Sequence, residues 1–202
     1  MKSGWISPWW QAFALPDEWD VCGVVVPPIT LWHSFALENI GNRYLWGGAC
    51  TEDDAASLLM FVQRDMAHGK ELLNPGLKNK RTRAILKVAK RLRKLEWSFV
   101  NAACREYVET CMRSVSRWQS GGSKPAAVPY QICLVSVLMK CMPIEQAWNT
   151  PYSQARCIFD AYAELKGDTS IMSTAAQEME DNWDHYKDLE GTKEISLAAR
   201  DN

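Results

Sequence analysis

Residues that commonly carry out chemistry are few in this sequence, and their spacing fits no catalytic motif. The three histidines are His33, His68 and His185. None of them belongs to an HExxH motif, and residues 121–124 lack the GxxxxGK spacing of a phosphate-binding loop. A helix would align Glu178, Asp181 and His185 as metal ligands, but a solvated acidic face explains that pattern better. We therefore predict no enzyme, no catalytic or metal-binding residue and no cofactor; an enzyme would need a deep polar pocket around His33 or His185.

The cysteines are not spaced for chemistry either. There are seven, an odd number, and no two of them have the CxxC spacing of zinc sites or redox motifs. Most lie in apolar runs, where a free cysteine packs as a small hydrophobic residue. Cys104 and Cys111 are seven residues apart, as neighbouring core positions on one helix are. We expect free thiols and a reducing cytoplasm.

Positive charge is concentrated in one segment. The chain has 23 basic and 24 acidic residues, but residues 78–94 contain nine lysines and arginines and no acid. The remainder has 14 basic against 24 acidic residues, a net charge of −10. From residue 160 onward there are 11 acidic and four basic residues. The nearly neutral chain therefore combines a basic segment with an acidic C-terminal region.

The basic segment has the pattern of an amphipathic helix. Its apolar residues include Ile85, Val88, Ala89 and Leu92, which recur at helical spacing. The cations opposite this stripe are Lys80, Arg83, Lys87, Lys90, Arg91 and Lys94. We predict that these six side chains bind a partner.

Three partners would fit such a face. It could contact nucleic-acid phosphates, although no helix-turn-helix or zinc-finger pattern accompanies it. It could contact an acidic protein surface, which we favour. It could also contact the acidic C-terminal region of the same chain or of a second copy, giving a homo-oligomer.

Four tryptophans gather in the first residues of the chain, and they are Trp5, Trp9, Trp10 and Trp19. Prolines interrupt this segment, so no long helix can bury them all. They either pack back on the helical body or contribute to a partner interface, where tryptophan is enriched. We include all four among the predicted partner-binding residues.

The first half of the chain is predicted to begin irregularly and continue as helices. Residues 21–26 form a β-strand candidate closed by two prolines. Thr30 caps a helix over residues 31–39, which Gly41 ends, and residues 42–48 form a loop. Thr51 caps an acidic helix start whose helix ends near Gly69, with His68 at its C-terminal end.

The second half is predicted to be helical on both sides of a linker. A helix runs over residues 81–118, with Phe99 and Ala103 continuing its apolar face and a break near residues 97–101. Further helices cover residues 129–140, which are apolar nearly all round, then 143–148, and 150–166 with Thr150 as the cap and Gly167 as the stop. Ser173 caps a last helix.

The predicted fold class is mainly α, a helical bundle-like body with an irregular N-terminal segment that includes a short β element. Residues 1–118 form the first region, 119–128 a linker and 129–202 a second helical region packed with the first as one unit. The central apolar run, residues 132–139, is far shorter than a membrane span of about 20 residues. We expect no membrane segment and no export signal.

Two stretches resemble a known class of protein. One is VCGVVVPPITLWHSFALENIGNRYLWGG followed by TEDDAASLLMFV, and the other is PYQICLVSVLMKCMPIEQAWNTPYSQARCIFDAYAELKGD. Both resemble small helical proteins of the tail-assembly-chaperone-like kind, encoded among the structural and tail genes of tailed bacteriophages. The late pattern is carried by Pro143, Ala147, Trp148, Ala155, Ala161 and Gly167. The resemblance implies binding to a viral structural protein, such as a tape measure or another tail component, and implies no catalytic residues.

The sequence therefore predicts a non-enzymatic bacteriophage protein for virion tail assembly, which acts in the host bacterial cytoplasm by binding another structural protein. The tryptophan-rich N-terminus and the basic helix would supply the contact surface. The alternative is a nucleic-acid-contacting helical protein that uses residues 78–94.

Overall fold

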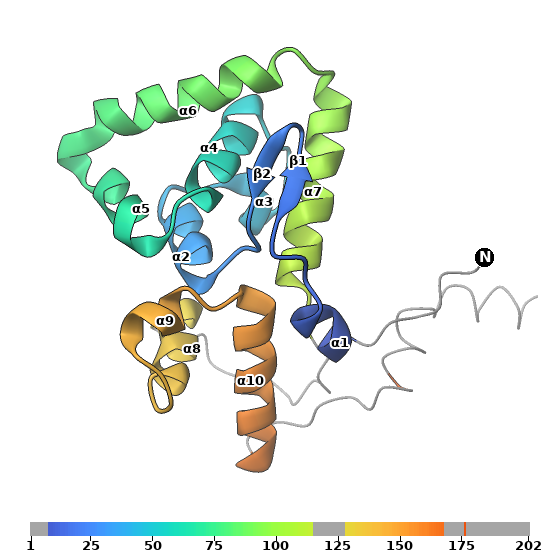
Figure 1. Ribbon diagram of the computed structural model, residues 1–202, viewed down its shortest axis with the longest axis vertical. Coiled ribbons are helices and arrows are strands. Elements are labelled where there is room, and N and C mark those ends of the chain that lie inside the picture. The colour runs from blue at the N-terminus through green and yellow to red at the C-terminus, as the bar shows by residue number, and fades with distance from the viewer. Residues whose placement is uncertain (1–7, 115–127, 168–175, 177–202) are drawn as a thin grey trace, which may run out of the picture.

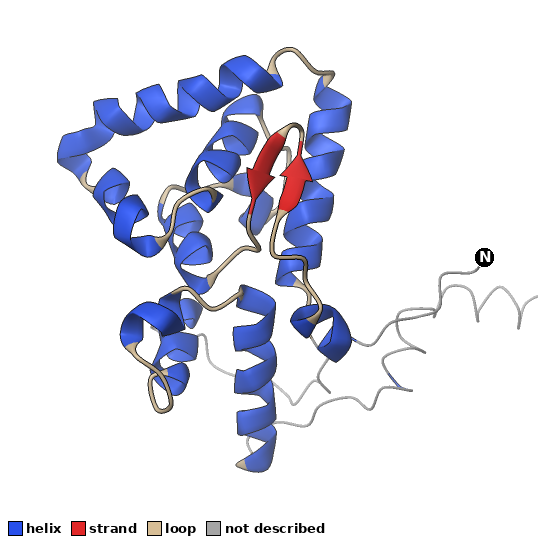
Figure 2. Cartoon of the chain, viewed as in Figure 1, coloured by secondary structure: helices blue, strands red, loops and turns tan. Residues whose placement is uncertain are grey.

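A computed structural model describes residues 8–114, 128–167 and 176 of the chain. Its described part consists of ten α-helices, one two-stranded antiparallel sheet and a short 3₁₀ turn at Pro75–Leu77 (Figure 2). The predicted mainly α fold class is confirmed. Several predicted features lie outside the described residues: Trp5, most of the linker 119–128, the helix after Ser173 apart from Ala176, and the aligned Glu178, Asp181 and His185.

The helices are α1 (Pro8–Phe13), α2 (Leu31–Asn39), α3 (Arg43–Trp46), α4 (Glu52–Val62), α5 (Met66–Leu73), α6 (Lys78–Leu92), α7 (Trp97–Met112), α8 (Tyr130–Leu138), α9 (Ile144–Trp148) and α10 (Tyr152–Leu165). The strands are β1 (Trp19–Val21) and β2 (Val24–Val26). α6 crosses one end of the molecule and packs chiefly on α4, while α10 lies at the opposite end with α8 and α1 (Figure 1).

The single strand predicted at residues 21–26 is wrong, because the chain reverses within it. Cys22 and Gly23 both have positive φ, 57° and 76°, and form the two-residue turn of a hairpin. Asp20 accepts a 2.7 Å hydrogen bond from the Gly23 N–H, which holds the turn. β1 and β2 then pack on α7 and α4.

The predicted start and end of α2 are confirmed. The Thr30 side chain accepts from the His33 N–H, the His33 imidazole accepts from the Thr30 N–H, and Gly41 follows the helix with φ of 69°. The loop predicted at residues 42–48 is wrong in part, because it contains the one-turn helix α3. The Asn42 side chain caps α3 and also donates to the Asp54 carbonyl and the Ser57 hydroxyl, so the turn is fixed against α4.

The helix predicted to run from Thr51 to near Gly69 is in fact two helices. Thr51 caps α4 as predicted, but α4 ends at Val62, and Asp65 caps α5. Gly69 lies inside α5 rather than at a helix end. The residue is a glycine because a Cβ there would come within 2.8 Å of Trp32 Nε1. His68 is therefore in the first turn of a helix, bonded to Asp65, and its predicted place at a C-terminus is wrong.

The long basic helix is broken, as predicted, but earlier than residues 97–101. α6 ends at Leu92, and residues 93–96 join it to α7. In α7 the buried side chains include Cys104 and Cys111, which confirms both as core positions. Phe99 is 57% exposed, so its predicted place on the apolar face is wrong, because the break rotates α7 relative to α6.

The C-terminal helices follow the prediction with two differences. α8 buries Gln131, Leu134, Val135 and Leu138, but Ile132 and Met139 on its other side are exposed, so it is not buried all round. Pro151, not Thr150, is the N-cap of α10. The Thr150 carbonyl instead accepts from the N–H of Leu31, the first residue of α2, and the Tyr152 N–H donates to the Ile29 carbonyl. Gly167 has φ of 76° and ends α10 as predicted.

Two hydrophobic clusters share α2. The larger contains the hairpin, most of α2 and side chains of α4 to α7; the smaller joins α8, α9 and α10 to Leu31. The polar contact between them is Gln131, whose amide donates to the Ser34 hydroxyl at 3.0 Å and the Glu38 carboxylate at 2.6 Å. α2 thus connects the layer that carries α6 with the helices that follow residue 128.

Candidate functional site

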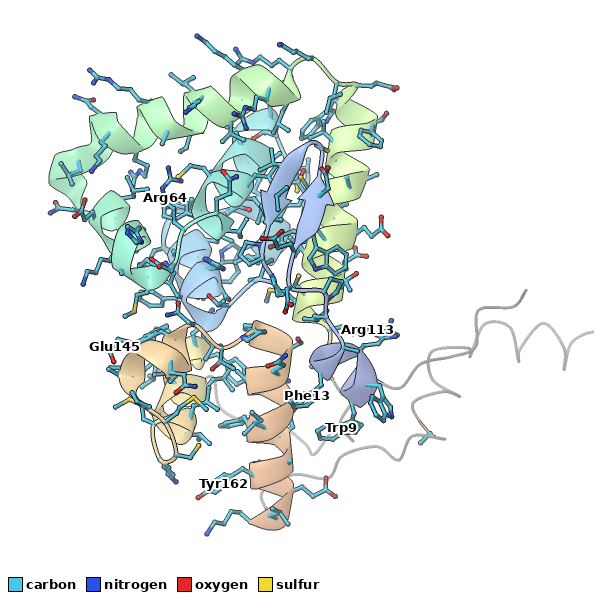
Figure 3. All side chains as sticks on the ribbon, viewed as in Figure 1. Trp9, Phe13, Arg64, Arg113, Glu145 and Tyr162 are labelled. Carbon is cyan, nitrogen blue, oxygen red and sulfur yellow. The ribbon has the colours of Figure 1, made fainter. Side chains whose placement is uncertain are left out.

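The basic face of α6 lies on the surface. Val88, Ala89 and Leu92 are buried against the rest of the protein, and Ile85 is half-buried. All six predicted partner-binding cations are exposed: Lys80, Arg83, Lys87, Lys90, Arg91 and Lys94. Nitrogen-tipped side chains project from the outer side of α6, away from the body of the molecule (Figure 3). The structure therefore brings the predicted cations together on one face.

Acidic residues pair with this helix at its two ends. Lys80 Nζ lies 3.1 Å from Glu71 Oε2, in α5, and Arg93 Nε lies 3.2 Å from Glu52 Oε2, in α4. The side chains of both pairs are at least half exposed, so each pair contributes at most about 1 kcal/mol. They fix the ends of α6 to the helices beside it.

The middle of the face has no such partners. Five of the predicted cations form no ion pair with any residue that the structure describes, and they are Arg83, Lys87, Lys90, Arg91 and Lys94. A surface of unpaired cations attracts anions and loses part of that attraction as salt is added. Its chemistry is therefore anion binding.

One hollow of about 320 Å³ opens along the seam between α4 and α6. Its polar lining comes from Gln63 and Arg64, which follow and flank the end of α4, and from Lys87 and Arg91 of α6. Its apolar lining is Met60, Ala84 and Val88. We call these seven residues the cationic pocket; its lining holds three cations and no carboxylate.

The sequence did not single out Arg64, because the prediction placed it inside a continuous helix. Its guanidinium donates to the Met60 carbonyl, and its own carbonyl accepts a 2.8 Å bond from His33 Nε2. The neighbouring Asp65 carboxylate is occupied by the His68 N–H and imidazole, which lower the pKa of Asp65. Arg64 is therefore held by two neutral groups: the Met60 carbonyl accepts from its guanidinium, and the His33 imidazole donates to its backbone carbonyl.

His33 is a structural residue with both ring nitrogens bonded. It is 2% exposed; Nδ1 accepts from the Thr30 N–H, so Nε2 carries the proton donated to Arg64. Burial lowers the pKa of His33 to about 4, so the imidazole is neutral at pH 7. Both ring nitrogens of His33 are therefore used in bonds within the protein, and neither is left to bind a ligand.

A second hollow, of about 380 Å³, also lies between α4 and α6. Asp53, Asp54 and Ser57 of α4 face Arg81 and Thr82 of α6 across it. Ile40, Ile85 and Leu86 complete the lining. We call these eight residues the mixed-charge pocket, because cation and carboxylates share it.

The tryptophans do not gather on one surface. Trp9 packs beside Ala12 and Cys157, next to α10, whereas Trp10 on the same short helix is 72% exposed. Trp19 packs edge-on against Tyr107 with ring centroids 5.9 Å apart, which fits the alternative of packing on the helical body. Partner binding by Trp10 stays a prediction, and Trp5 lies outside the described residues.

Other predicted features can be located as well. All seven cysteines have free thiols, as expected. Among residues 8–114, 128–167 and 176, no group of three or more His, Cys, Asp or Glu side chains is placed to hold a metal ion. Within the same residues no helix is both long and apolar enough to cross a membrane.

Comparison with protein-family models, with curated proteins and with solved structures finds no match for the chain. Its function must therefore be inferred from its own residues. Of the arrangements described above, the unpaired middle of α6 and the cationic pocket beside it have the most definite chemistry, which is the binding of an oxyanion.

Proposed function

We propose that the chain is a non-enzymatic assembly protein of the tailed-bacteriophage kind, which binds another structural protein of the virion tail in the host cytoplasm. The observation that carries the binding role is the exposed basic face of α6, in which Arg83, Lys87, Lys90, Arg91 and Lys94 form no ion pair with any described residue. The assignment to a phage tail is supported by the sequence resemblance of the two stretches quoted above. In the fold these stretches meet, because α2 of the first contacts α8, α9 and α10 of the second.

An acidic polypeptide suits this face for two reasons. Electrostatic complementarity accelerates encounter and selects partners of opposite charge. The face also carries exposed apolar side chains, since Leu86 in α6 is 45% exposed and Leu95 just beyond it is 40% exposed. Mixed basic and apolar surface can bury the apolar side of an amphipathic partner as well as neutralise its charge.

The second candidate is nucleic-acid contact through the same cations. It is favoured by their regular positions, because Arg83, Lys87 and Arg91 recur every fourth residue along one exposed helix face. It is opposed by the absence of any aromatic residue in the sequence of α6, since single-stranded nucleic acid is bound largely by stacking on aromatic rings.

Co-expression tests the first candidate. The full chain is produced with each structural protein encoded beside it, and soluble complex is measured by co-purification. We expect one partner to co-purify with the wild type but not with K87E/R91E, in which the charge of two cations is reversed. The control variant K166E reverses a charge at the end of α10, far from this face, and should retain the partner. Failure of every neighbouring structural protein to co-purify contradicts the proposal.

A salt titration tests the second candidate. Binding of the full chain to duplex and single-stranded DNA is followed by fluorescence anisotropy from about 20 to 200 mM salt, a range over which phosphate contacts weaken steeply. Affinity that falls steeply with salt and is lost in K87E/R91E supports nucleic-acid contact. The absence of measurable binding at low salt rules it out.

A further inference from the structure

We propose that the cationic pocket is the specific recognition element of the basic face, and that it binds the carboxylate of a glutamate or aspartate side chain from an amphipathic partner polypeptide. This inference rests on the proposed function, since it names the group by which the partner is recognised. The residues that carry it are Arg64, Lys87 and Arg91, with Gln63 as a neutral donor.

The lining of the cationic pocket carries an excess of positive charge. Three cations line one hollow of about 320 Å³, and neither the lining nor an ion pair among the described residues supplies an anion to Lys87, Arg91 or Arg64. Cations gathered on one hollow repel each other, and a bound anion relieves that repulsion. The mixed-charge pocket on the same seam contains its own carboxylates and lacks this property.

The guanidinium of Arg64 is held in place before any ligand binds. Arg64 is half-buried, and its guanidinium is held by the Met60 carbonyl while His33 holds its backbone. A guanidinium that bonds one carbonyl keeps further N–H groups free for a carboxylate, which it can bind with two parallel hydrogen bonds. Little side-chain entropy is lost when a ligand binds a group already held in this way.

The cationic pocket combines its polar groups with an apolar lining. Met60, Ala84 and Val88 give the hollow an apolar lining, which suits the methylene groups of an acidic side chain. Gln63 also donates to the carbonyl of Val25, whose side chain is 53% exposed, so apolar surface continues past the pocket. This combination favours an amphipathic polypeptide over the polar sugar-phosphate backbone of nucleic acid.

The spacing of the flanking cations fits a helical partner. Arg83, Lys87 and Arg91 lie about 6 Å apart along α6, which is the rise of four helical residues. Glutamates at every fourth position of a partner helix have the same spacing. One of them would enter the pocket while its neighbours contact the exposed part of the face.

Fluorescence anisotropy with defined probes tests the inference on the full chain. The first probe is a labelled helical peptide of about 20 residues made of Glu, Leu and Ala, the second is the same peptide with Gln for Glu, and the third is a thymidine oligonucleotide of similar length. The pocket variants Arg64→Gln and Arg91→Gln are compared with Arg83→Gln and Lys90→Gln, which remove the same charge from α6 outside the pocket.

We expect the glutamate peptide to bind the wild type, and each pocket variant to weaken this binding about tenfold, as loss of one charge-assisted hydrogen bond to the carboxylate does. Each control variant should weaken it by less than about threefold, as loss of an exposed charge does. The glutamine peptide should bind weakly and show no difference between Arg91→Gln and Lys90→Gln. Thermal unfolding by circular dichroism verifies that Arg91→Gln, whose side chain has no ion pair among the described residues, is folded.

Three results overturn the inference. Equal losses in all four variants would mean that the whole face binds by charge alone, which leaves the proposed function intact. Tighter binding of the oligonucleotide, with the largest loss in the pocket variants, would identify a phosphate site. No binding of the glutamate peptide at about 50 mM salt, where exposed charges are only partly screened, would show that the pocket does not recognise carboxylates; co-expression then decides separately whether the proposed function fails.

Discussion

Two hollows lie on the seam between α4 and α6, and they differ in how their charges are balanced. In the mixed-charge pocket, Arg81 of α6 faces Asp53 and Asp54, and Asp54 also completes the cap of α4 by accepting from the Thr51 N–H and hydroxyl. In the cationic pocket, Arg64, Lys87 and Arg91 share the lining with no carboxylate. The lining of the mixed-charge pocket thus holds charges of both signs, whereas the charged side chains that line the cationic pocket are all positive.

The acidic residues around this seam stabilise helix ends rather than the cationic pocket. Glu52, Asp54 and Glu71 occupy helix caps or pair with the ends of α6, positions at which they stabilise the local structure. None of the three lines the cationic pocket. The exposed cations of α6 that have no ion pair among the described residues are therefore the part of this surface that an anionic partner would stabilise most.

The largest expected effect comes from removing the support of Arg64. His33→Ala leaves the Arg64 carbonyl and the Thr30 N–H without their partner and opens a cavity, so we expect a loss of about 3–5 kcal/mol in the free energy of unfolding. His68→Ala, at a 79% exposed side chain, should cost less than about 0.5 kcal/mol. Urea denaturation measures both. Equal small losses would show that His33 does not support this side of the seam.

The pH dependence of stability is the next largest effect. The unfolded chain protonates His33 near pH 6.5, but burial lowers the pKa in the folded protein to about 4. Because the unfolded state binds the proton first, stability is complete above about pH 6.5 and falls as the pH drops towards 4, by about 3 kcal/mol.

Urea denaturation across this pH range checks the expectation, with His33→Gln as the control that cannot titrate. The decrease between pH 6.5 and 4 should be much smaller in His33→Gln than in the wild type. A decrease of the same size in both proteins would assign it to other groups.

A smaller effect distinguishes the two pockets directly. Gln63→Glu adds a carboxylate of the same shape as the native side chain to the cationic pocket, so it should stabilise the protein by about 0.5 kcal/mol. The same carboxylate should weaken binding of the glutamate peptide, because it occupies the cations that the peptide would contact. In the mixed-charge pocket, Thr82→Glu adds a carboxylate where two already lie, so it should not stabilise the protein relative to Thr82→Gln. Equal stabilisation at both positions would remove the distinction between the pockets.

The smallest expected effect is stabilisation by a simple oxyanion. Sulfate at about 5 mM, compared with chloride at equal ionic strength, should stabilise the wild type by about 0.5 kcal/mol or less through weak binding to the cationic pocket. Thermal melting should show the effect in Lys90→Gln but not in Arg91→Gln. The same sulfate effect in both variants would place the anion elsewhere.

Local sequence signals predicted the parts of the fold that local chemistry decides. Thr30, Thr51, Gly41 and Gly167 cap or end helices as predicted, since those roles depend on a few adjacent residues. The amphipathic pattern also placed the cations of residues 78–94 on the exposed side of a helix.

Signals that depend on distant partners were misread. The sequence predicts Gly69 to be a helix stop, but it lies within α5. A glycine is needed there because the ring of Trp32, far away in sequence, occupies the space that a Cβ would fill. The cationic pocket could not be predicted either. It exists because α4 ends at Val62 and turns Arg64 towards α6, a geometry fixed by His33 and by the packing of α4 on α6.

The central claim is that Arg64 and Arg91 bind a carboxylate of a partner polypeptide, and nuclear magnetic resonance of the arginine side chains tests it most directly. The Nε–H signals of isotope-labelled full-length protein are followed during titration with the glutamate peptide and with the glutamine peptide. We expect large, saturating shifts of the Arg64 and Arg91 signals with the glutamate peptide alone, and only small shifts of the Arg83 signal. Unchanged Arg64 and Arg91 signals at peptide saturation would contradict it.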